Sequence, residues 1–301
     1  MKKALSLIIA LALVLVVASC TPMTSEPATS QTPTPEKPTT VTIVGTEDIV
    51  ISLDVTELDL SDSGIGDISA LSLLTNLVSL NLSGNQVDTV VPLASLTKLT
   101  TLNLSGNIIT EIDSLSSLTN LKSLDLNNNQ IVDITPLASL TQLYDPKLND
   151  NRISDISTLS PQIFGTELDL SGNQISDLTP LSAFTGLTRL NLGSNAITDI
   201  TPLAALTNLT ELDLIINFIE DATPLSSLTS LKLLLLDSNN LTNVDGLSSL
   251  TELETLVLSF NYINDISPLS ALTNLTTLDL RYNNIVDWEP VAHVPDVNGR
   301  P

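Results

Sequence analysis

The sequence is poor in the residues that catalytic sites and nucleic-acid interfaces need. Its 301 residues include one cysteine and one histidine, and only 11 basic residues stand against 34 acidic ones, for a formal net charge of -23. Nucleic-acid binding draws most of its affinity from Lys and Arg that neutralise phosphates, so no nucleic-acid partner is expected. The same charge disfavours an anionic membrane surface unless a covalent anchor holds the chain there.

The scarcity of catalytic side chains argues against an enzyme. His293 is the only histidine and lies near Val291 and Val294, close to the end of the chain. A catalytic base needs a partnered nucleophile, and the sequence suggests none, so His293 is interpreted as a surface residue of the end of the fold. We therefore expect no catalytic residue, no cofactor and no metal.

The low aromatic content constrains the core. Aromatic residues make up 3% of the chain and apolar residues 42%, so a core must be built from Leu, Ile and Val packed as many similar small layers. A domain count taken from chain length does not apply to such an array. Internal repeats are therefore the first feature to examine.

An asparagine recurs every 22 residues without interruption, and Ser63 occupies the same slot one step earlier. Leucines precede the asparagines by five and three residues, as in Leu80 and Leu82. Chance does not produce such a register, and we predict one structural coil per 22 residues. The asparagines are Asn85, Asn107, Asn129, Asn151, Asn173, Asn195, Asn217, Asn239, Asn261 and Asn283.

Two leucines separated by one residue lie on the same face of a short strand, which points them inward. At the end of the strand the chain must turn, and backbone groups lose their sheet partners. An inward Asn can serve both donors and acceptors there, so stacked coils are predicted to form a ladder of asparagines. Removing one is expected to cost about 1 to 3 kcal/mol, because buried polar groups lose their partners.

Beyond this turn the pattern Ile-x-Asp-Ile-Thr-Pro-Leu appears, for example in residues 131–137 and 197–203. Thr or Ser before Pro is a helix-start signal, with Pro at the first helical position, and it predicts a single helical turn of 3₁₀ type. The predicted N-caps are Thr135, Thr179, Thr201, Thr223 and Ser267. The strands, which are more closely spaced than the turns, are expected to form one parallel sheet of ten steps, about 48 Å long.

The segment from Leu275 to Ile285 resembles a leucine-rich repeat, and the fixed length of 22 with Asp-Ile-Ser/Thr-Pro-Leu resembles bacterial internalin-type repeats. The resemblance covers residues 57–288. It implies an α/β solenoid, a leucine-rich repeat horseshoe with a parallel β-sheet on the concave face and short 3₁₀ or helical turns on the convex face, which binds macromolecules through its concave face. The sequence shows no cell-wall sorting motif and no room for a following immunoglobulin-like domain, so host-cell adhesion does not carry over.

The amino terminus carries the pattern of a signal sequence. Lys2 and Lys3 precede an uncharged stretch of 15 residues, 4–18, which is shorter than the roughly 20 residues of a membrane-spanning helix. Residues 17–20, Val-Ala-Ser-Cys, resemble the lipobox of bacterial lipoproteins, which implies cleavage before Cys20 and acylation of its thiol. An ordinary secretory signal followed by a chance cysteine is the alternative.

These features predict five segments and an extracytoplasmic protein, lipid-anchored to the bacterial cell membrane or envelope. Proline, threonine and serine predominate in residues 21–40, which is typical of an extended tether. The predicted segments are a signal peptide (1–19), a lipidated Cys with a Pro/Thr-rich tether (20–40), an N-terminal β cap (41–56), leucine-rich repeats (57–288) and a C-terminal tail or cap (289–301).

The outward-facing strand positions change from polar to apolar along the array. Clustered apolar residues with aromatic and Arg neighbours are typical of a partner-binding surface. The alternative is repeat drift, in which these residues are merely tolerated or are covered by the chain's own tail. The predicted partner-binding residues are Ile215, Ile216, Leu233, Leu235, Val257, Phe260, Arg281 and Tyr282.

Acidic residues also recur on the predicted strand face and alternate with asparagines. Neighbouring repeats rarely place two carboxylates side by side, so a calcium cage of six to eight oxygens is difficult to assemble, and a solvated face is favoured over a cation site. The acids are Asp59, Asp125, Asp169, Asp213 and Asp279, and the asparagines between them are Asn81, Asn103 and Asn191.

A second irregularity is Pro146, which replaces the first core leucine of its strand and cannot donate a hydrogen bond to an interior ladder. A hinge or a dent for a ligand is one interpretation, and local weakness is the favoured one.

Together, the sequence predicts a monomeric, surface-tethered binding scaffold that captures a protein or polysaccharide on the concave face. The rival is a structural envelope spacer without a discrete ligand, and an enzyme is a distant third.

Overall fold

The computed structural model describes residues 39–44, 48–161 and 164–300. The predicted signal peptide, Cys20 and the tether up to residue 38 lie outside the described residues. The described chain opens with an antiparallel hairpin of β1 (Thr40–Ile43) and β2 (Ile49–Ser52). Ile43 and Ile51 are buried and join the core of the repeats that follow.

Every coil of the repeat array except the one around residues 145–147 contributes a strand of three residues, and neighbouring strands pair in parallel. The middle residue is a leucine and points into the core, because successive side chains of a strand face opposite sides. These strands are β3 (Glu57–Asp59), β4 (Ser79–Asn81), β5 (Thr101–Asn103), β6 (Ser123–Asp125), β7 (Glu167–Asp169), β8 (Arg189–Asn191), β9 (Glu211–Asp213), β10 (Leu233–Leu235), β11 (Thr255–Val257) and β12 (Thr277–Asp279). A last strand, β13 (Asp296–Asn298), pairs with β12.

The prediction of one unbroken sheet is wrong. The strands form a four-stranded sheet, β3 to β6, and a seven-stranded sheet, β7 to β13. Between them, residues 145–147 join β6 only through the isolated bridge of Lys147 with Asp125. Pro146 is buried in the slot of a core leucine but has no N–H to donate, and Asp145 before it has a left-handed backbone with φ 51°. Pairing between the coils resumes at Asp150 N–H to Ser171 O, 2.8 Å.

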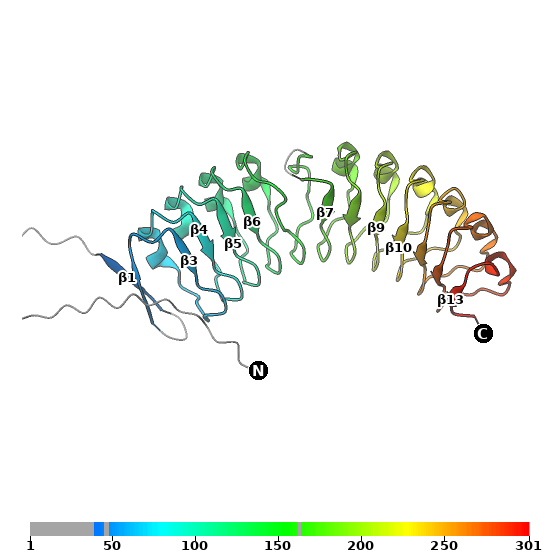
Figure 1. Ribbon diagram of the computed structural model, residues 1–301, viewed down its shortest axis with the longest axis horizontal. Helices are drawn as coiled ribbons and strands as arrows, with labels where there is room; N and C mark the ends of the chain where they lie inside the picture. Colours follow the sequence, from blue (N-terminus) through cyan, green and yellow to red (C-terminus); the bar gives the residue numbers. More distant parts are fainter. Residues whose placement is uncertain (1–38, 45–47, 162–163, 301) are drawn as a thin grey trace, which may run out of the picture. The chain divides into compact units, whose positions relative to one another are not determined.

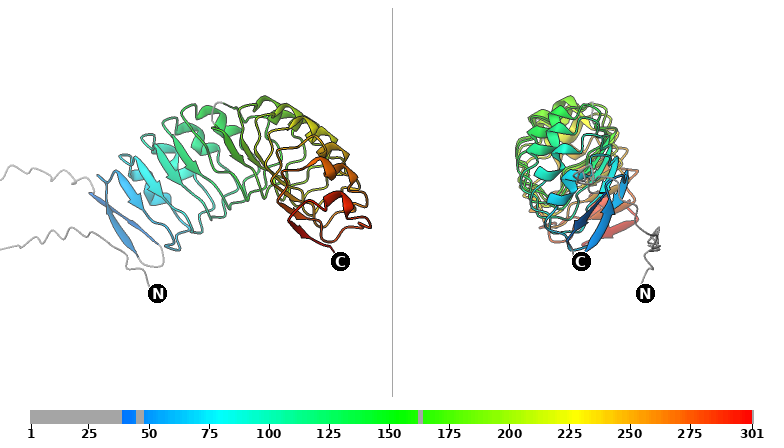
Figure 2. Two further views of the ribbon diagram at one scale, coloured as in Figure 1. Left: turned by 45° about the vertical axis from the view of Figure 1, so that its right-hand side comes forward. Right: turned by 90° about the vertical axis from the view of Figure 1, so that its left-hand side faces the viewer.

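Short 3₁₀ helices lie opposite the strands, as predicted. In the repeat array the 3₁₀ turns follow the outer, convex side of the arc, and the strands lie side by side from coil to coil on the inner side of these turns (Figure 1, Figure 2). The turns are η1 (Ser69–Leu73), η2 (Val91–Ser95), η3 (Asp113–Ser117), η4 (Thr135–Ser139), η5 (Thr179–Ala183), η6 (Thr201–Ala205), η7 (Thr223–Ser227), η8 (Asp245–Leu247), η9 (Ser267–Ala271) and η10 (Glu289–Val291).

The predicted N-caps are wrong by one position and in mechanism. Thr135 is the first residue of its turn and Pro136 the second, and the preceding Ile134 occupies the N-cap without a side-chain bond. The cap is supplied by Asp133, whose Oδ1 accepts the Thr135 N–H at 2.8 Å. An aspartate bonds readily to a backbone N–H two residues ahead, which leaves the hydroxyl unused as a cap. The same bond forms at Thr179, Thr201, Thr223 and Ser267, from Asp177, Asp199, Asp221 and Asp265.

The recurring asparagines bridge neighbouring coils. Asn195 Nδ2 donates to Leu170 O of the preceding coil at 3.0 Å and to Leu192 O of its own coil at 3.1 Å, while its Oδ1 accepts the Ile175 N–H at 2.9 Å. All ten asparagines from Asn85 to Asn283 make the equivalent three bonds. Each side chain thus satisfies backbone groups that the turn removes from the sheet.

Candidate functional site

The outward side chains of the strands form two parallel rows across the coils. The first row contains Glu167, Arg189, Glu211 and Leu233, and the second contains Asp169, Asn191, Asp213, Leu235 and Val257. Both rows change from charged or polar to apolar between β9 and β10; the second row stays apolar at Val257 of β11, whereas the first returns to a polar residue at Thr255. The polarity change that the sequence predicted is therefore a boundary in register across the sheet.

Aspartates and asparagines of the second row help to close the turn after each strand. Asp213 Oδ1 accepts the Ile215 N–H at 3.0 Å, and Asn81 Oδ1 accepts the Ser83 N–H at the same distance. Since either residue supplies the oxygen, the alternation needs no ligand to explain it. The others with this bond are Asp59, Asn103, Asp125, Asp169, Asn191 and Asp279. Among the described residues, no group of three or more His, Cys, Asp or Glu is placed to hold a metal ion.

Leu235 and Val257 depart from this rule, because a leucine or valine side chain cannot accept a hydrogen bond. They are paired neighbours in the second row and both are half-buried, as are Leu233 and Ile215. The Ile215 side chain leans over Gly193 of the preceding coil, where a methyl group on the glycine would lie 2.9 Å from Ile215 Cγ1. We call Ile215, Leu233, Leu235 and Val257 the apolar face.

The residue before each asparagine of the ladder has a left-handed backbone. Gly, Asn, Asp or Ser fills this slot in most coils, but Ile216 (φ 50°), Phe260 (φ 53°) and Tyr282 (φ 57°) fill it in the C-terminal half. A positive φ strains β-branched and bulky residues at a cost of about 1 to 3 kcal/mol each. Their side chains are 54%, 52% and 67% exposed. Burial in the core therefore does not offset the backbone strain at these three residues.

Two exposed aromatic residues at the same edge were not predicted. Phe218 and Tyr262, 55% and 60% exposed, each follow a ladder asparagine. The signal was present, since two aromatics share one repeat slot in a chain with few aromatics. Phe260 and Tyr282 stack with ring centroids 4.2 Å apart. We call Ile216, Phe218, Phe260, Tyr262 and Tyr282 the aromatic edge; Ser238 and Asn240 of the intervening coil divide it in two.

Arg281 is fixed beside this edge by a nearly buried carboxylate. Its Nη2 and Nε donate to Asp279 Oδ2 at 2.5 and 3.1 Å, and Nε also donates to Oδ1 at 3.0 Å. Burial opposes ionisation of Asp279, but the hydrogen bonds and charge of Arg281 outweigh it and hold the pKa of Asp279 below its ordinary value. Arg281 remains more than half exposed and lies one residue before Tyr282.

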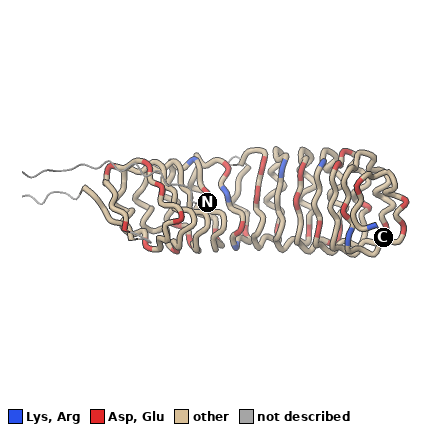
Figure 3. The backbone as a smooth tube through the Cα atoms, turned by 60° about the horizontal axis from the view of Figure 1, so that its bottom comes forward, with Lys and Arg blue, Asp and Glu red and all other residues tan. Residues whose placement is uncertain are grey.

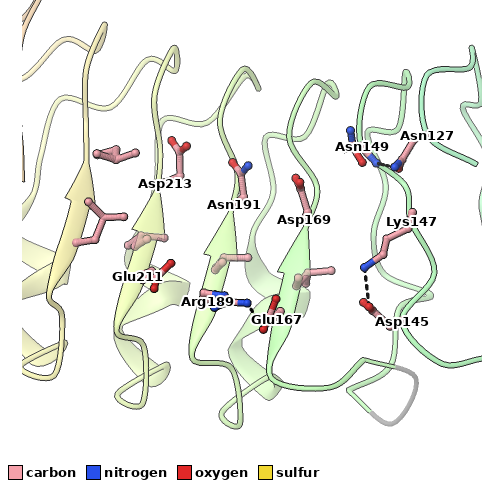
Figure 4. Close-up of a pocket in the computed structure, with 15 residues that line it drawn as sticks. Asn127, Asp145, Lys147, Asn149, Glu167, Asp169, Arg189, Asn191, Glu211 and Asp213 are labelled. Carbon is pink, nitrogen blue, oxygen red and sulfur yellow. Dashed lines mark hydrogen bonds and ion pairs between the residues drawn. The ribbon is translucent and has the colours of Figure 1, made fainter. Parts of the chain in front are cut away.

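A hollow of about 460 Å³ lies on the strand face beside the break in the sheet (Figure 4). Five acidic and two basic side chains line it, and Leu233 and Leu235 lie at its β10 end. Lys147 pairs with Asp145 at 2.6 Å, and Arg189 pairs with Glu167. Along the opposite edge Asp169, Asn191 and Asp213 stand in a row (Figure 4).

Comparison with known proteins identifies the repeat. Family models for leucine-rich repeats match residues 97–139, 166–205, 185–227, 229–271 and 251–293, and a second such model matches 53–74 and 73–90. The chain belongs to the leucine-rich repeat family. This leucine-rich repeat protein is 33% identical to an internalin (inlF) of Listeria monocytogenes over 84% of its own length and 90% of that chain, with a TM-score of 0.58.

Two further structures are similar to this leucine-rich repeat protein. The functional domain of InlJ from Listeria monocytogenes is 27% identical, with a TM-score of 0.68 over 83% of this chain and 55% of that one. A leucine-rich repeat protein of Leptospira interrogans, 22% identical with a TM-score of 0.57 over 82% and 84% of the two chains, shares the fold. No curated protein matches the sequence. Proteins of this repeat family act as protein-binding scaffolds through the extended surface that stacked coils create.

The leucine-rich repeat array is rich in acidic residues and poor in basic ones. Acidic residues are spread along the array, whereas basic residues are few (Figure 3). In the hollow, burial raises the pKa of Asp213, and the charges of Asp169 and Asp237 act in the same direction against the bond from Ile215 N–H. The hydrogen bond from Arg189 lowers the pKa of Glu167. The hollow thus contains the ion pairs of Lys147 with Asp145 and of Arg189 with Glu167, together with Asp213, whose ionised form is disfavoured by burial.

The structure also places the remaining sequence candidates. His293 is exposed near the end of the chain, with its Nε2 3.0 Å from Leu272 O. Among the described residues, no helix of this leucine-rich repeat protein is long and apolar enough to cross a membrane.

Proposed function

We propose that this protein is a surface-tethered scaffold that captures a protein partner on its strand face, with the apolar face and the aromatic edge as the main contact. The observation that carries the proposal is a double departure from the repeat between β9 and β12. Leu235 and Val257 replace residues that bond to the backbone, and Ile216, Phe260 and Tyr282 occupy slots that glycine fills without strain.

Both departures oppose the stability of the isolated array. Where a sequence breaks a local rule without a gain in the fold, a binding role is the expected reason. Exposed aromatic side chains beside a fixed Arg are also the groups that dominate protein-protein contacts. A polysaccharide partner is less well supported, because the apolar face offers few hydrogen-bonding groups.

The tether is the second part of the proposal and rests on the sequence around Cys20. Replacing Cys20 by Ala should move the protein from the membrane pellet to the soluble fraction of the cell. Equal pelleting of the variant and the unmodified chain would contradict lipid anchoring, and would leave partner capture untouched.

Partner capture is tested by photo-crosslinking on the full chain in its own cells. A photoreactive phenylalanine at Tyr262 should give one discrete crosslinked protein, whereas the same group at Gln86, the matching slot of an early coil, should not. Changing Leu235 and Val257 together to Asp should remove that product without lowering thermal stability. A structural spacer predicts equal and diffuse crosslinking at both sites.

A further inference from the structure

The polarity of the two rows on the strand face indicates the chemistry of the segment that the protein captures. Across β7, β8, β9, β10 and β11 the second row runs in register from acid to amide, acid, leucine and valine. The first row changes at the same place, from Glu211 to its paired neighbour Leu233. A segment that follows the second row therefore meets negative charge and then an apolar surface on Leu235 and Val257, to which Leu233 of the first row adds.

The hollow has a surplus of negative charge. Of its five acidic side chains, Asp145 and Glu167 are paired with Lys147 and Arg189. Within the described residues of the hollow, Asp169, Glu211 and Asp213 belong to no ion pair, so the formal charge of the lining is −3. A cationic group that enters this space gains attraction without displacing an existing pair.

The cation that fits is a flexible side chain rather than a metal ion. Asn191 and Arg189 separate the carboxylates of β7 from those of β9, and no three ligating side chains among the described residues converge. A space of about 460 Å³ that is open to solvent accommodates a Lys or Arg side chain with its apolar stem against Leu233 or Leu235.

We infer that the captured partner offers an extended segment with a Lys or Arg side chain in the hollow and an apolar side chain on Leu235 and Val257. This inference rests on the proposed function and names the partner chemistry. From β9 to β11 is two coil steps of about 4.8 Å, and an extended chain advances about 3.3 Å per residue, so about three residues separate the two side chains. The excess of negative charge also speeds the approach of a basic segment at low salt.

The test uses fluorescein-labelled peptides of Gly and Ser that carry Lys and, three residues away, Leu, in both orders, with anisotropy measured on the full chain. The basic-apolar peptide should bind, and replacing its Lys by Glu or its Leu by Ser should weaken binding about tenfold or more. High salt should weaken binding of the Lys peptide. Failure of both peptides to bind, or equal binding of the Glu peptide, overturns the inference.

Matched variants separate this inference from partner capture itself. Glu211→Gln with Asp213→Asn should weaken the Lys peptide about tenfold and abolish most of its salt dependence, since both changes keep the shape and remove the charge. Asp59→Asn, in the same strand slot as Asp213 but seven coils away by sequence register, should leave binding of the Lys peptide unchanged. If the Leu235/Val257 change abolishes crosslinking of the natural partner while the Glu211/Asp213 change does not weaken it, the function stands and this inference fails. If neither changes it, both fail.

Discussion

The coils of β3 to β6 and those of β9 to β12 share one backbone and differ in the surface it displays. Both have inward leucines, the same asparagine bonds and a left-handed residue before each asparagine. In the first group the outward rows are polar and the left-handed slots hold Asp62, Gly84, Gly106 and Asn128. The difference teaches that the inward and turn residues keep the frame even where the outward residues change, so the outer face can vary while the fold is retained.

The largest effect should come from the shared frame and should be equal in the two groups. Asn107→Ala and Asn195→Ala each strand three backbone groups that the asparagine serves. Each should lower the free energy of unfolding by about 3 kcal/mol, measured by urea denaturation followed by circular dichroism. A loss in one group only would show that the two frames are not equivalent.

Pro146→Leu tests whether the break between the two sheets is caused by one residue. Leucine fills this slot in the neighbouring coils and restores an N–H for the ladder, so unfolding should require about 1 to 2 kcal/mol more. Hydrogen exchange should slow at the amides of Leu148 and Asp169. Pro136→Leu, at a 3₁₀ turn outside the sheet, is the control and should slow neither amide. Unchanged exchange in Pro146→Leu would place the cause elsewhere in that coil.

An exchange of residues at the left-handed slot sharpens the comparison further. Phe260→Gly should raise the free energy of unfolding by about 1 kcal/mol through release of backbone strain, while it removes a proposed partner contact. Gly106→Phe should lower the free energy of unfolding by a similar amount. A Cβ at this position would lie 3.5 Å from Gly84 N, an ordinary contact, so the backbone strain is the only cost expected. Thermal unfolding of the two variants should shift in opposite directions. Shifts of the same sign would refute the strain argument.

The smallest effects should have opposite signs at two equivalent aspartates. Burial raises the pKa of Asp213, so the stability linked to its proton is present at low pH and lost as pH rises through the folded-state value. Asp213→Asn should therefore stabilise the protein slightly at neutral pH. The Ser61 backbone N–H lowers the pKa of Asp59, so its contribution is present above the ordinary value and lost as pH falls through the lowered one.

Asp59→Asn should accordingly destabilise the protein slightly at neutral pH. Both differences should fade in acid, where the carboxyl groups of the unmodified protein are protonated in either state. Melting temperatures of the two variants and the unmodified chain over a pH series measure this. Equal shifts of one sign at neutral pH would rule out burial as the cause at Asp213.

The repeat, its inward leucines and the 3₁₀ turns were predictable because they follow from spacing alone. The break at Pro146 was harder to predict, since its effect depends on hydrogen bonds to two neighbouring coils. The caps were assigned to the wrong side chain because Asp133 and Thr135 are both good acceptors, and only geometry decides between them. The glycines at three left-handed slots already indicated the backbone that Phe260 adopts.

The site was less predictable than the fold. Leu235 and Phe260 could be recognised as irregular by their register, but a sequence does not give the fraction of each that is exposed. The hollow is lined by residues of β7, β8, β9 and β10 and by residues between 127 and 149, so no single segment indicates it. The pairing of Arg189 with Glu167 is likewise a relation between coils.

The asparagine ladder also bears on how such a protein can be inherited. Because each asparagine binds only its own coil and the preceding one, duplication or loss of 22 residues between β4 and β5 leaves every other bond in place. The hollow and the apolar face would then keep their positions relative to each other. A duplication between β9 and β10 would instead separate them by one coil. Recombination in the gene can therefore lengthen the molecule and still preserve the spacing between the hollow and the apolar face.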